Sequence, residues 1–216
     1  MRVIAIDGPA GSGKSTVART LADRVGLPYL DTGAMYRAVT FAALRRGVDP
    51  DDVERVARIA RECDLELDED GTVRVDGVDA TIEIRGPEVT RAVSIVAANP
   101  QVREEMRRRQ RAWAEEHGGG VMEGRDIGTV VFPEAVLKVY LDARPEVRAA
   151  RRSKEVTDLS YETVAAELAR RDALDQGRAH DPLREAPDAI VIDTSDLGVD
   201  EIVEVIEARL AEGAAP

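Results

Sequence analysis

Residues 8–15 read G-P-A-G-S-G-K-S and match the phosphate-binding pattern G-x-x-x-x-G-K-S in full. An apolar stretch at residues 3–6 precedes the match, and apolar side chains at helical spacing follow it. In that context the backbone N–H groups of a glycine-rich turn and the helix N-terminus converge on phosphate oxygens. Lys14 then reaches the β- and γ-phosphates, and Ser15 holds Mg²⁺.

We therefore expect a nucleoside triphosphate at this loop. The alternative is a glycine-rich turn that ends in Gly-Lys-Ser by chance, and the flanking strand and helix disfavour it. The residues expected to contact the triphosphate are Gly8, Pro9, Ala10, Gly11, Ser12, Gly13, Lys14, Ser15 and Thr16.

The composition restricts the classes of partner. The chain has 216 residues and a formal net charge of −12, which disfavours nonspecific binding to nucleic acid or to an anionic membrane. Its 44% hydrophobic content suffices for one core with a small inserted lobe. Among its 30 basic residues only Lys14, Lys138 and Lys154 are lysines, so a lysine in the phosphate loop is less easily dismissed as background.

Three features favour the cytoplasm. Cys63 is the only cysteine, so an intrachain disulfide is impossible and a cysteine-based metal cluster is disfavoured. Met1 is followed almost at once by an apolar strand, which leaves no room for a signal peptide. No apolar run approaches the length of about 18 residues that a membrane span needs. We expect a cytoplasmic monomer with neither a membrane nor a nucleic acid as partner.

Strands and helices alternate, which predicts the α/β class: three layers with a central parallel sheet. Core strands are expected at 3–6, 28–30, 121–123, 137–141 and 189–192. We expect one helix over 34–46, closed by Gly47 in the C′ position, and another from the N-cap Ser160 to about residue 174. Residues 65–84 instead form short alternating pieces around Asp-Gly turns, which predicts a small inserted antiparallel lobe.

Polar groups collect after the predicted strands, where open parallel sheets place their ligands. Two of these segments are more specific than the phosphate loop. Residues 31–37 read D-T-G-A-M-Y-R, and residues 123–133 read E-G-R-D-I-G-T-V-V-F-P. They resemble the two hallmark segments of bacterial cytidylate kinases, and the similarity extends from Val3 to about Ser195.

The resemblance implies the P-loop fold of nucleoside monophosphate kinases and a Mg²⁺-dependent transfer of the γ-phosphoryl group of ATP to CMP or dCMP. It also implies one domain, 1–216, with a core of 1–62, 101–147 and 170–216. The lobe at about 63–100 would bind the nucleoside monophosphate, and a helical lid would span about 148–169.

Site residues follow from the same resemblance. Arg37 and Arg125 resemble the pair that grips the acceptor phosphate, for which planar guanidinium groups are suited. The alternative for each arginine is a surface ion pair. Asp175 resembles the residue that accepts from the ribose hydroxyls, although an ion pair with Arg171 one helical turn away is an alternative. The acceptor set is completed by Asp31, Thr32, Tyr36, Gly124, Arg171 and Arg178.

Cytosine presents an amino donor beside two acceptors, so its recognition needs an acceptor and a donor together. Ser94, Arg103 and Asp126 match the base-contacting positions of the family, and an aspartate that accepts from the amino group disfavours uracil. Without the resemblance, Ser94 would be read as a helix-surface serine and Arg103 as part of a solvated, arginine-rich helix face.

The sequence suggests two further roles and shows two departures from the family. Arg148, Arg151 and Arg152 match lid arginines that act on the phosphoryl group in transit. Glu123, at the end of a strand, can hold Mg²⁺ through water. The stretch between Glu155 and Tyr161 is shorter than the usual lid segment, and the run from Ala179 to Leu183 is less apolar than in relatives. We assign no catalytic role to His180 within that run.

Three other functions stay open. A small P-loop kinase acting on AMP, UMP or a non-nucleotide such as shikimate would share the phosphate loop. A GTPase-type switch would need an Asn-Lys-x-Asp motif, yet the only asparagine, Asn99, precedes a proline. An RNA-binding protein could use the arginines of residues 107–111, and the acidic net charge disfavours it.

Overall fold

A computed structural model describes residues 1–68, 71–155, 159–178 and 180–213. The chain divides into two compact units, of which the first comprises Met1–Tyr29 and His117–Pro216 and the second Leu30–Glu116. The predicted division into core, lobe at 63–100 and lid at 148–169 stays a prediction, since it follows function rather than compactness.

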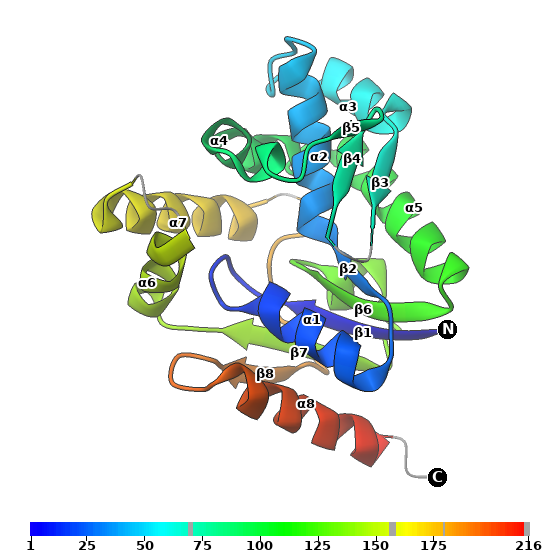
Figure 1. Cartoon of the computed structure of the whole chain (residues 1–216), viewed down its shortest axis with the longest axis vertical. Coiled ribbons are helices and arrows are strands. Elements are labelled where there is room, and N and C mark those ends of the chain that lie inside the picture. The colour runs from blue at the N-terminus through cyan, green and yellow to red at the C-terminus, as the bar shows by residue number, and fades with distance from the viewer. Residues whose placement is uncertain (69–70, 156–158, 179, 214–216) are drawn as a thin grey trace. The chain divides into compact units, whose positions relative to one another are not determined.

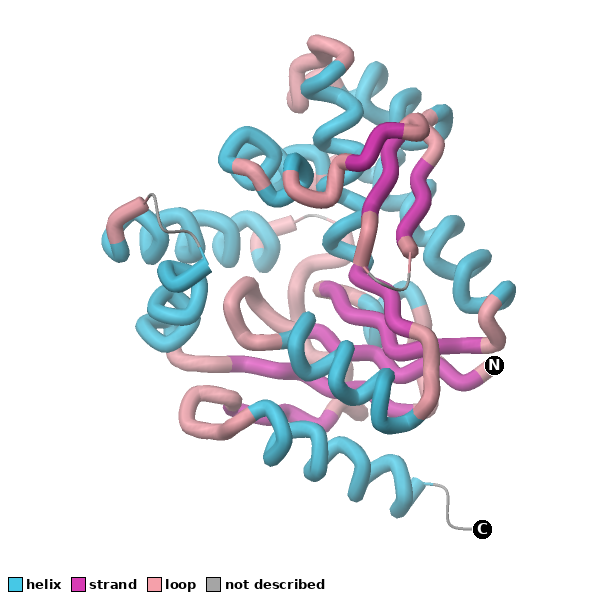
Figure 2. The backbone as a smooth tube through the Cα atoms, viewed as in Figure 1, coloured by secondary structure: helices cyan, strands magenta, loops and turns pink. Residues whose placement is uncertain are grey.

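The first unit is built on parallel strands (Figures 1 and 2). The five-stranded sheet has the order β2-β6-β1-β7-β8, and β1 pairs in parallel with both β6 and β7. The strands of this sheet are β1 (Arg2–Asp7), β2 (Tyr29–Asp31), β6 (Gly119–Gly124), β7 (Leu137–Asp142) and β8 (Ile190–Asp193), and the boundary between the two units falls within β2, after Tyr29. The helices of this unit are α1 (Lys14–Val25), α6 (Pro145–Glu155), α7 (Tyr161–Gln176) and α8 (Val199–Gly213), with a short helical turn η2 (Ile127–Val131). The predicted α/β class with a central parallel sheet is confirmed.

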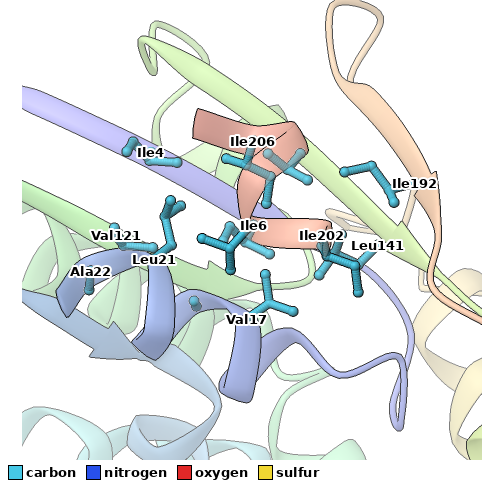
Figure 3. Packing of buried hydrophobic residues seen from close by; sticks show 13 residues of the cluster. Ile4, Ile6, Val17, Leu21, Ala22, Val121, Leu141, Ile192, Ile202 and Ile206 are labelled. Atoms are coloured by element: carbon cyan, nitrogen blue, oxygen red, sulfur yellow. The ribbon is translucent and has the colours of Figure 1, made fainter. Parts of the chain in front are cut away.

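Aliphatic side chains of α1 and α8 fasten these helices to the sheet. Figure 3 shows Val17 and Leu21 of α1 and Ile206 of α8 gathered around Ile4 and Ile6 of β1. All of these side chains are buried, and each contributes about 1.5–3 kcal/mol to folding by leaving water. The rigid support this gives to β1 and α1 matters because the phosphate loop joins their ends.

The second unit carries the small antiparallel sheet predicted for the lobe. Its order is β3-β4-β5, and both neighbouring pairs are antiparallel. The strands are β3 (Leu65–Leu67), β4 (Val73–Val75) and β5 (Val78–Asp79). The helices are α2 (Thr32–Arg45), α3 (Val53–Glu62), α4 (Pro87–Val96) and α5 (Pro100–Glu116), with a short 3₁₀ turn η1 (Glu83–Arg85).

Side-chain caps explain where two helices begin. The helix predicted over 34–46 starts earlier, at Thr32, because Asp31 Oδ1 accepts from the backbone N–H of Ala34 at 2.9 Å. Gly47 follows the helix with a φ of 63°, as its predicted C′ position requires. The predicted N-cap Ser160 is confirmed, since its side chain accepts from Thr163 N. Among the described residues, none of the helices has the length and apolarity to cross a membrane.

Candidate active site

The phosphate loop lies between β1 and α1, and its path excludes larger residues. Gly8 has a φ of 149°, and a Cβ atom there would lie 2.0 Å from the Leu141 carbonyl oxygen. Gly11 has a φ of 77°, and a Cβ atom there would meet the backbone of Arg148 at 3.0 Å. Both positions therefore require glycine, because the loop passes directly against the end of β7 and against α6.

Lys14 is buried at the start of α1, although Ser15 and Thr16 beside it are exposed. Its Nζ donates to the Pro9 carbonyl oxygen at 2.7 Å, across the loop. Burial lowers the pKa of Lys14 to about 7, and the Arg125 guanidinium adds to the effect, while Glu123 and Asp7 oppose it. An anion bound at this site would offset these effects and stabilise the charged ammonium group of Lys14.

A Mg²⁺ ion fits this loop as a partner of bound phosphates. Ser15 offers an exposed hydroxyl, and Glu123 is buried at the end of β6, where its Oε1 accepts from Tyr29 Oη at 2.7 Å. Within the described residues, no group of three or more His, Cys, Asp or Glu side chains could hold a metal. One hydroxyl and one carboxylate match the way Mg²⁺ is held mainly by substrate phosphates and water.

Asp175 of α7 joins two of the predicted arginines. Its Oδ2 accepts from Arg125 Nε at 2.9 Å, and its Oδ1 accepts from Arg178 at 2.5 Å. Burial alone would raise the pKa of Asp175, but Arg125 and Arg178 hold it below the usual value. Asp175 is therefore a carboxylate with cations on both oxygens, rather than the partner of an Arg171 ion pair.

Positive charge exceeds what the neighbouring carboxylates neutralise. Burial, and after it the nearby Arg125, lowers the pKa of Arg171 to about 10. The Nε atom of Arg171 is buried and has no hydrogen-bond partner among the described residues. Arg125 and Arg171 both lower the pKa of Lys14, and Arg125 lowers that of Arg171, whereas Asp175, acting against burial, raises the pKa of Arg125. A phosphate group would stabilise the charged forms of Lys14 and Arg171.

The three predicted lid arginines are all bound to protein groups. Arg148 donates to the carbonyl oxygens of Ala143 and Ala10 and to Asp172 Oδ2. Arg151 donates to both the side chain and the carbonyl oxygen of Thr194, whose hydroxyl donates to the Ser12 carbonyl oxygen at 3.0 Å. The bond from Arg152 goes to Glu155 on the same helix, at 2.6 Å. Their action on the transferred group stays a prediction.

In the second unit, Arg37 on α2 is held from two sides. Its Nη1 donates to the Ile84 carbonyl oxygen and to Thr90 Oγ1, at 3.0 Å each. Asp31, which caps α2, also lies 3.7 Å from the guanidinium of Arg85. These contacts fix Arg37 against η1 and α4, so it is not a loosely solvated surface arginine.

Ser94 on α4 and Arg103 on α5, the two positions predicted to contact the base, are buried, so their alternative interpretation as surface residues is wrong. Arg103 is 1% exposed, donates to the Ala97 carbonyl oxygen, and stacks its guanidinium 5.8 Å from the centre of the Tyr36 ring. Ser94 is 4% exposed. The neighbouring Arg108 and Arg109 pair with Glu105, and Arg109 also donates to the carbonyl oxygens of Ala60, Arg61 and Cys63, so the expected solvated face holds for Arg108 but not for Arg109.

The other predicted residues are placed as follows. Thr32 and Tyr36 are buried within the second unit, and Gly124 and Asp126 are buried within the first. His180 is exposed. The short stretch noted between Glu155 and Tyr161 consists largely of residues 156–158, which lie outside the described residues. The run from Ala179 to Leu183 begins at Ala179, which also lies outside them.

Four side chains in these networks escaped the sequence reasoning. Asp172, Thr194 and Thr90 each accept from a predicted arginine, and Asp7 accepts from the backbone of Ile127, directly after the predicted Asp126. A signal existed for two of them. Asp7 ends an apolar strand directly before Gly8, and Thr194 follows the last strand, so both stand at carboxyl ends of parallel strands.

Comparison with known proteins gives a consistent result. A family model described as cytidylate kinase matches residues 4–212. The cytidylate kinase of Geobacillus kaustophilus is 51% identical over 210 residues, covering 94% of this chain and 93% of the relative. The cytidylate kinase of Pelotomaculum thermopropionicum is 50% identical over 218 residues, covering 97% and 96%.

Solved structures agree on the fold. TT1252 from Thermus thermophilus has a TM-score of 0.51 at 24% identity, covering 98% of this chain and 97% of that one. Shikimate kinase from Bacteroides thetaiotaomicron has a TM-score of 0.51 at 12% identity, covering 97% and 98%. At such identities the likeness concerns the fold alone. The match along residues 4–212 and the relatives near 50% identity establish that this chain belongs to the cytidylate kinase family.

Proposed function

We propose that this chain transfers the γ-phosphoryl group of ATP to the 5′-phosphate of CMP or dCMP, giving CDP or dCDP and ADP. The observation that carries the proposal is the family match over residues 4–212, together with about 50% identity to named cytidylate kinases. The lowered pKa values of Lys14 and Arg171, both caused by burial and by the nearby Arg125, support it, because such a cluster favours phosphate.

The reaction requires the protein mainly to position the two nucleotides and to neutralise the charge on their phosphates. The attacking oxygen of the acceptor phosphate is already anionic at neutral pH, so no strong general base is needed. Lys14 would neutralise charge on the donor phosphates, and Arg125 would align the acceptor phosphate in line with them. When bound, Mg²⁺ supplies further charge neutralisation, and Ser15 and Glu123 are the residues proposed to hold it.

Acceptor recognition is proposed to involve both units. Arg37 and Arg125 would share the 5′-phosphate, and Asp175 would accept from the ribose hydroxyls. Asp126 would accept from the cytosine amino group while Arg103 donates to the ring. Asp31, Thr32, Tyr36, Ser94, Gly124, Arg171 and Arg178 complete the proposed acceptor site.

The lid arginines are proposed to exchange partners during turnover. Arg148, Arg151 and Arg152 now bind protein groups that a phosphate can replace. Movement of these side chains onto the γ-phosphoryl group would stabilise its charge and help to exclude water. We further propose that the enzyme works as a cytoplasmic monomer on free nucleotides, with no nucleic acid or membrane partner.

The test is a panel of CMP, dCMP, UMP, AMP and shikimate with Mg-ATP, read as kcat/KM. We expect CMP and dCMP to lead, and equal use of all acceptors would contradict the proposal. Lys14→Met should lower kcat by about a hundredfold or more while the protein stays folded. Asp126→Ala should reduce the preference for CMP over UMP more than it reduces the affinity for ATP.

A further inference from the structure

Asp7 connects the phosphate loop to the Gly-Arg-Asp segment at residues 124–126. It is the last residue of β1 and directly precedes Gly8. Its Oδ1 accepts from the backbone N–H of Ile127 at 2.9 Å, and its Oδ2 accepts from that of Gly128 at 2.8 Å. Both carboxylate oxygens are therefore committed to two consecutive amides far along the chain.

Those two amides open the η2 turn immediately after Arg125 and Asp126. A carboxylate at the start of a helical turn satisfies N–H groups that would otherwise lack partners. The approach is close, because a Cβ atom on Gly128 would lie 3.4 Å from Asp7 Oδ2 and 3.1 Å from Lys138 Cγ. The position of the segment thus depends on one side chain that is covalently continuous with the phosphate loop.

Burying the ionised carboxylate of Asp7 costs more free energy than a neutral side chain would in a purely structural link. It is 5% exposed, and burial together with the neighbouring Asp126 opposes its ionised form, so its pKa is raised to about 7 despite the two amide bonds and Lys14. A neutral serine or asparagine could cap a helical turn without that cost. Only the carboxylate accepts two N–H bonds side by side from one side chain and adds an anion beside Lys14.

We propose that Asp7 is a positioning residue that holds the Gly-Arg-Asp segment in register with the phosphate loop. The donor phosphates lie on the loop that follows Asp7, and the acceptor phosphate is gripped by Arg125 from the segment that Asp7 anchors. The residue thereby sets the spacing between donor and acceptor. This inference rests on the proposed function, since it assigns the acceptor phosphate to Arg125.

The position of Asp7 beside Lys14 gives the substitution a distinctive signature. Asp7→Asn keeps the size of the side chain, but its amide group faces one N–H as a donor and loses that bond. It also removes a negative charge near the triphosphate site. Acceptor binding should therefore weaken, while binding of the polyanionic donor should be unchanged or tighter.

The experiment measures the KM for CMP, kcat, and the Kd for Mg-ATP without acceptor, for wild type and Asp7→Asn. We expect the KM for CMP to rise about tenfold, kcat to fall, and the Kd for Mg-ATP to stay level or decrease. The matched control is Asp52→Asn, whose parent carboxylate caps α3 by accepting from Arg55 N at 3.1 Å. That control should leave all three quantities unchanged.

Two results would overturn the inference. One is a variant with the KM for CMP and the kcat of wild type. The other is a parallel loss of Mg-ATP and CMP binding with a lowered Tm, which is what a merely structural role predicts. If Asp7→Asn does not fold, Asp7→Ser with hydrogen exchange at the Ile127 and Gly128 amides gives the same decision: local acceleration supports the link, and unchanged exchange contradicts it. If the wild-type protein does not phosphorylate CMP, that result refutes the proposed function and not this inference.

Discussion

Arg148 of α6 and Asp172 of α7 form a largely buried ion pair, 2.5 Å between Nη1 and Oδ2. Arg148 also donates to the carbonyl oxygen of Ala10 in the phosphate loop. The pair therefore ties two helices of the first unit to the loop that is proposed to bind ATP. Removing one partner would leave an uncompensated charge in a poorly solvated place.

We expect Asp172→Ala to lower the free energy of unfolding by about 3 kcal/mol, because Arg148 then stays buried without its counter-ion. Urea denaturation measures the change. The matched control is Glu212→Ala, since Arg209 and Glu212 form a pair whose side chains are 55% and 65% exposed. Loss of that pair should cost less than about 0.5 kcal/mol, and equal effects of the two variants would contradict the reasoning.

Gly8→Ala should abolish Mg-ATP binding. The added Cβ atom would lie 2.0 Å from the Leu141 carbonyl oxygen, so the loop has to move. Titration calorimetry with Mg-ATP provides the measurement. Gly47→Ala is the control: Gly47 has a φ of 63° but open space around a Cβ atom. It should lose about 1–2 kcal/mol of stability and bind Mg-ATP as before.

Thr194→Val removes a hydroxyl that bridges two parts of the donor site. The hydroxyl accepts from Arg151 and donates to the Ser12 carbonyl oxygen. We expect the KM for ATP to rise about tenfold, with less effect on the KM for CMP. The control is Thr40→Val, which makes the same chemical change at another buried site. There the hydroxyl donates to the Tyr36 carbonyl oxygen of its own helix, so the KM for ATP should stay unchanged.

The thiol of Cys63 should react slowly in the folded protein. Burial raises its pKa from 9.0 to about 11, with Arg109 opposing the shift. Because the thiolate is the reactive form, alkylation by iodoacetamide near neutral pH should be about a hundredfold slower than in urea. Mass spectrometry can follow the reaction without ambiguity, since the chain has one cysteine. Equal rates in the folded and unfolded chain would contradict the burial.

The raised pKa of Cys63 also makes the stability of the folded protein depend on pH. The thiol of the folded state has the higher pKa, so its contribution is fully present below about pH 9 and is lost as the pH rises towards 11. Thermal unfolding at stepped pH values should show this loss, and Cys63→Ala should reduce it.

Local chemistry made much of the fold predictable. A few adjacent residues determine each of three local features, and the structure has all of them: the glycine-rich loop between β1 and α1, the C′ glycine at Gly47 and the N-cap at Ser160. The antiparallel lobe follows from short alternating pieces between turns. The early start of α2 shows the limit of this reasoning, because Asp31 both ends β2 and caps α2, whereas the helix was expected only from residue 34.

Contacts between distant residues could not be predicted in the same way. Arg103 shares a helix with solvated arginines such as Arg108, and its burial reflects contacts such as those with the Tyr36 ring and the Ala97 carbonyl oxygen. Asp7 binds amides 120 and 121 residues away, and no local pattern encodes such a pairing. For these residues, tertiary packing rather than sequence spacing determines the environment.

The intramolecular bonds of Arg37, Arg148 and Arg151 have a consequence for the speed of the catalytic cycle. An arginine that already binds protein oxygens exchanges one set of bonds for another when a phosphate arrives, so the net gain in free energy is small. If these arginines bind phosphate as proposed, we expect nucleotides to bind with moderate strength and the same protein oxygens to take back each arginine on product release. The intramolecular bonds of the free protein would then favour release of the product.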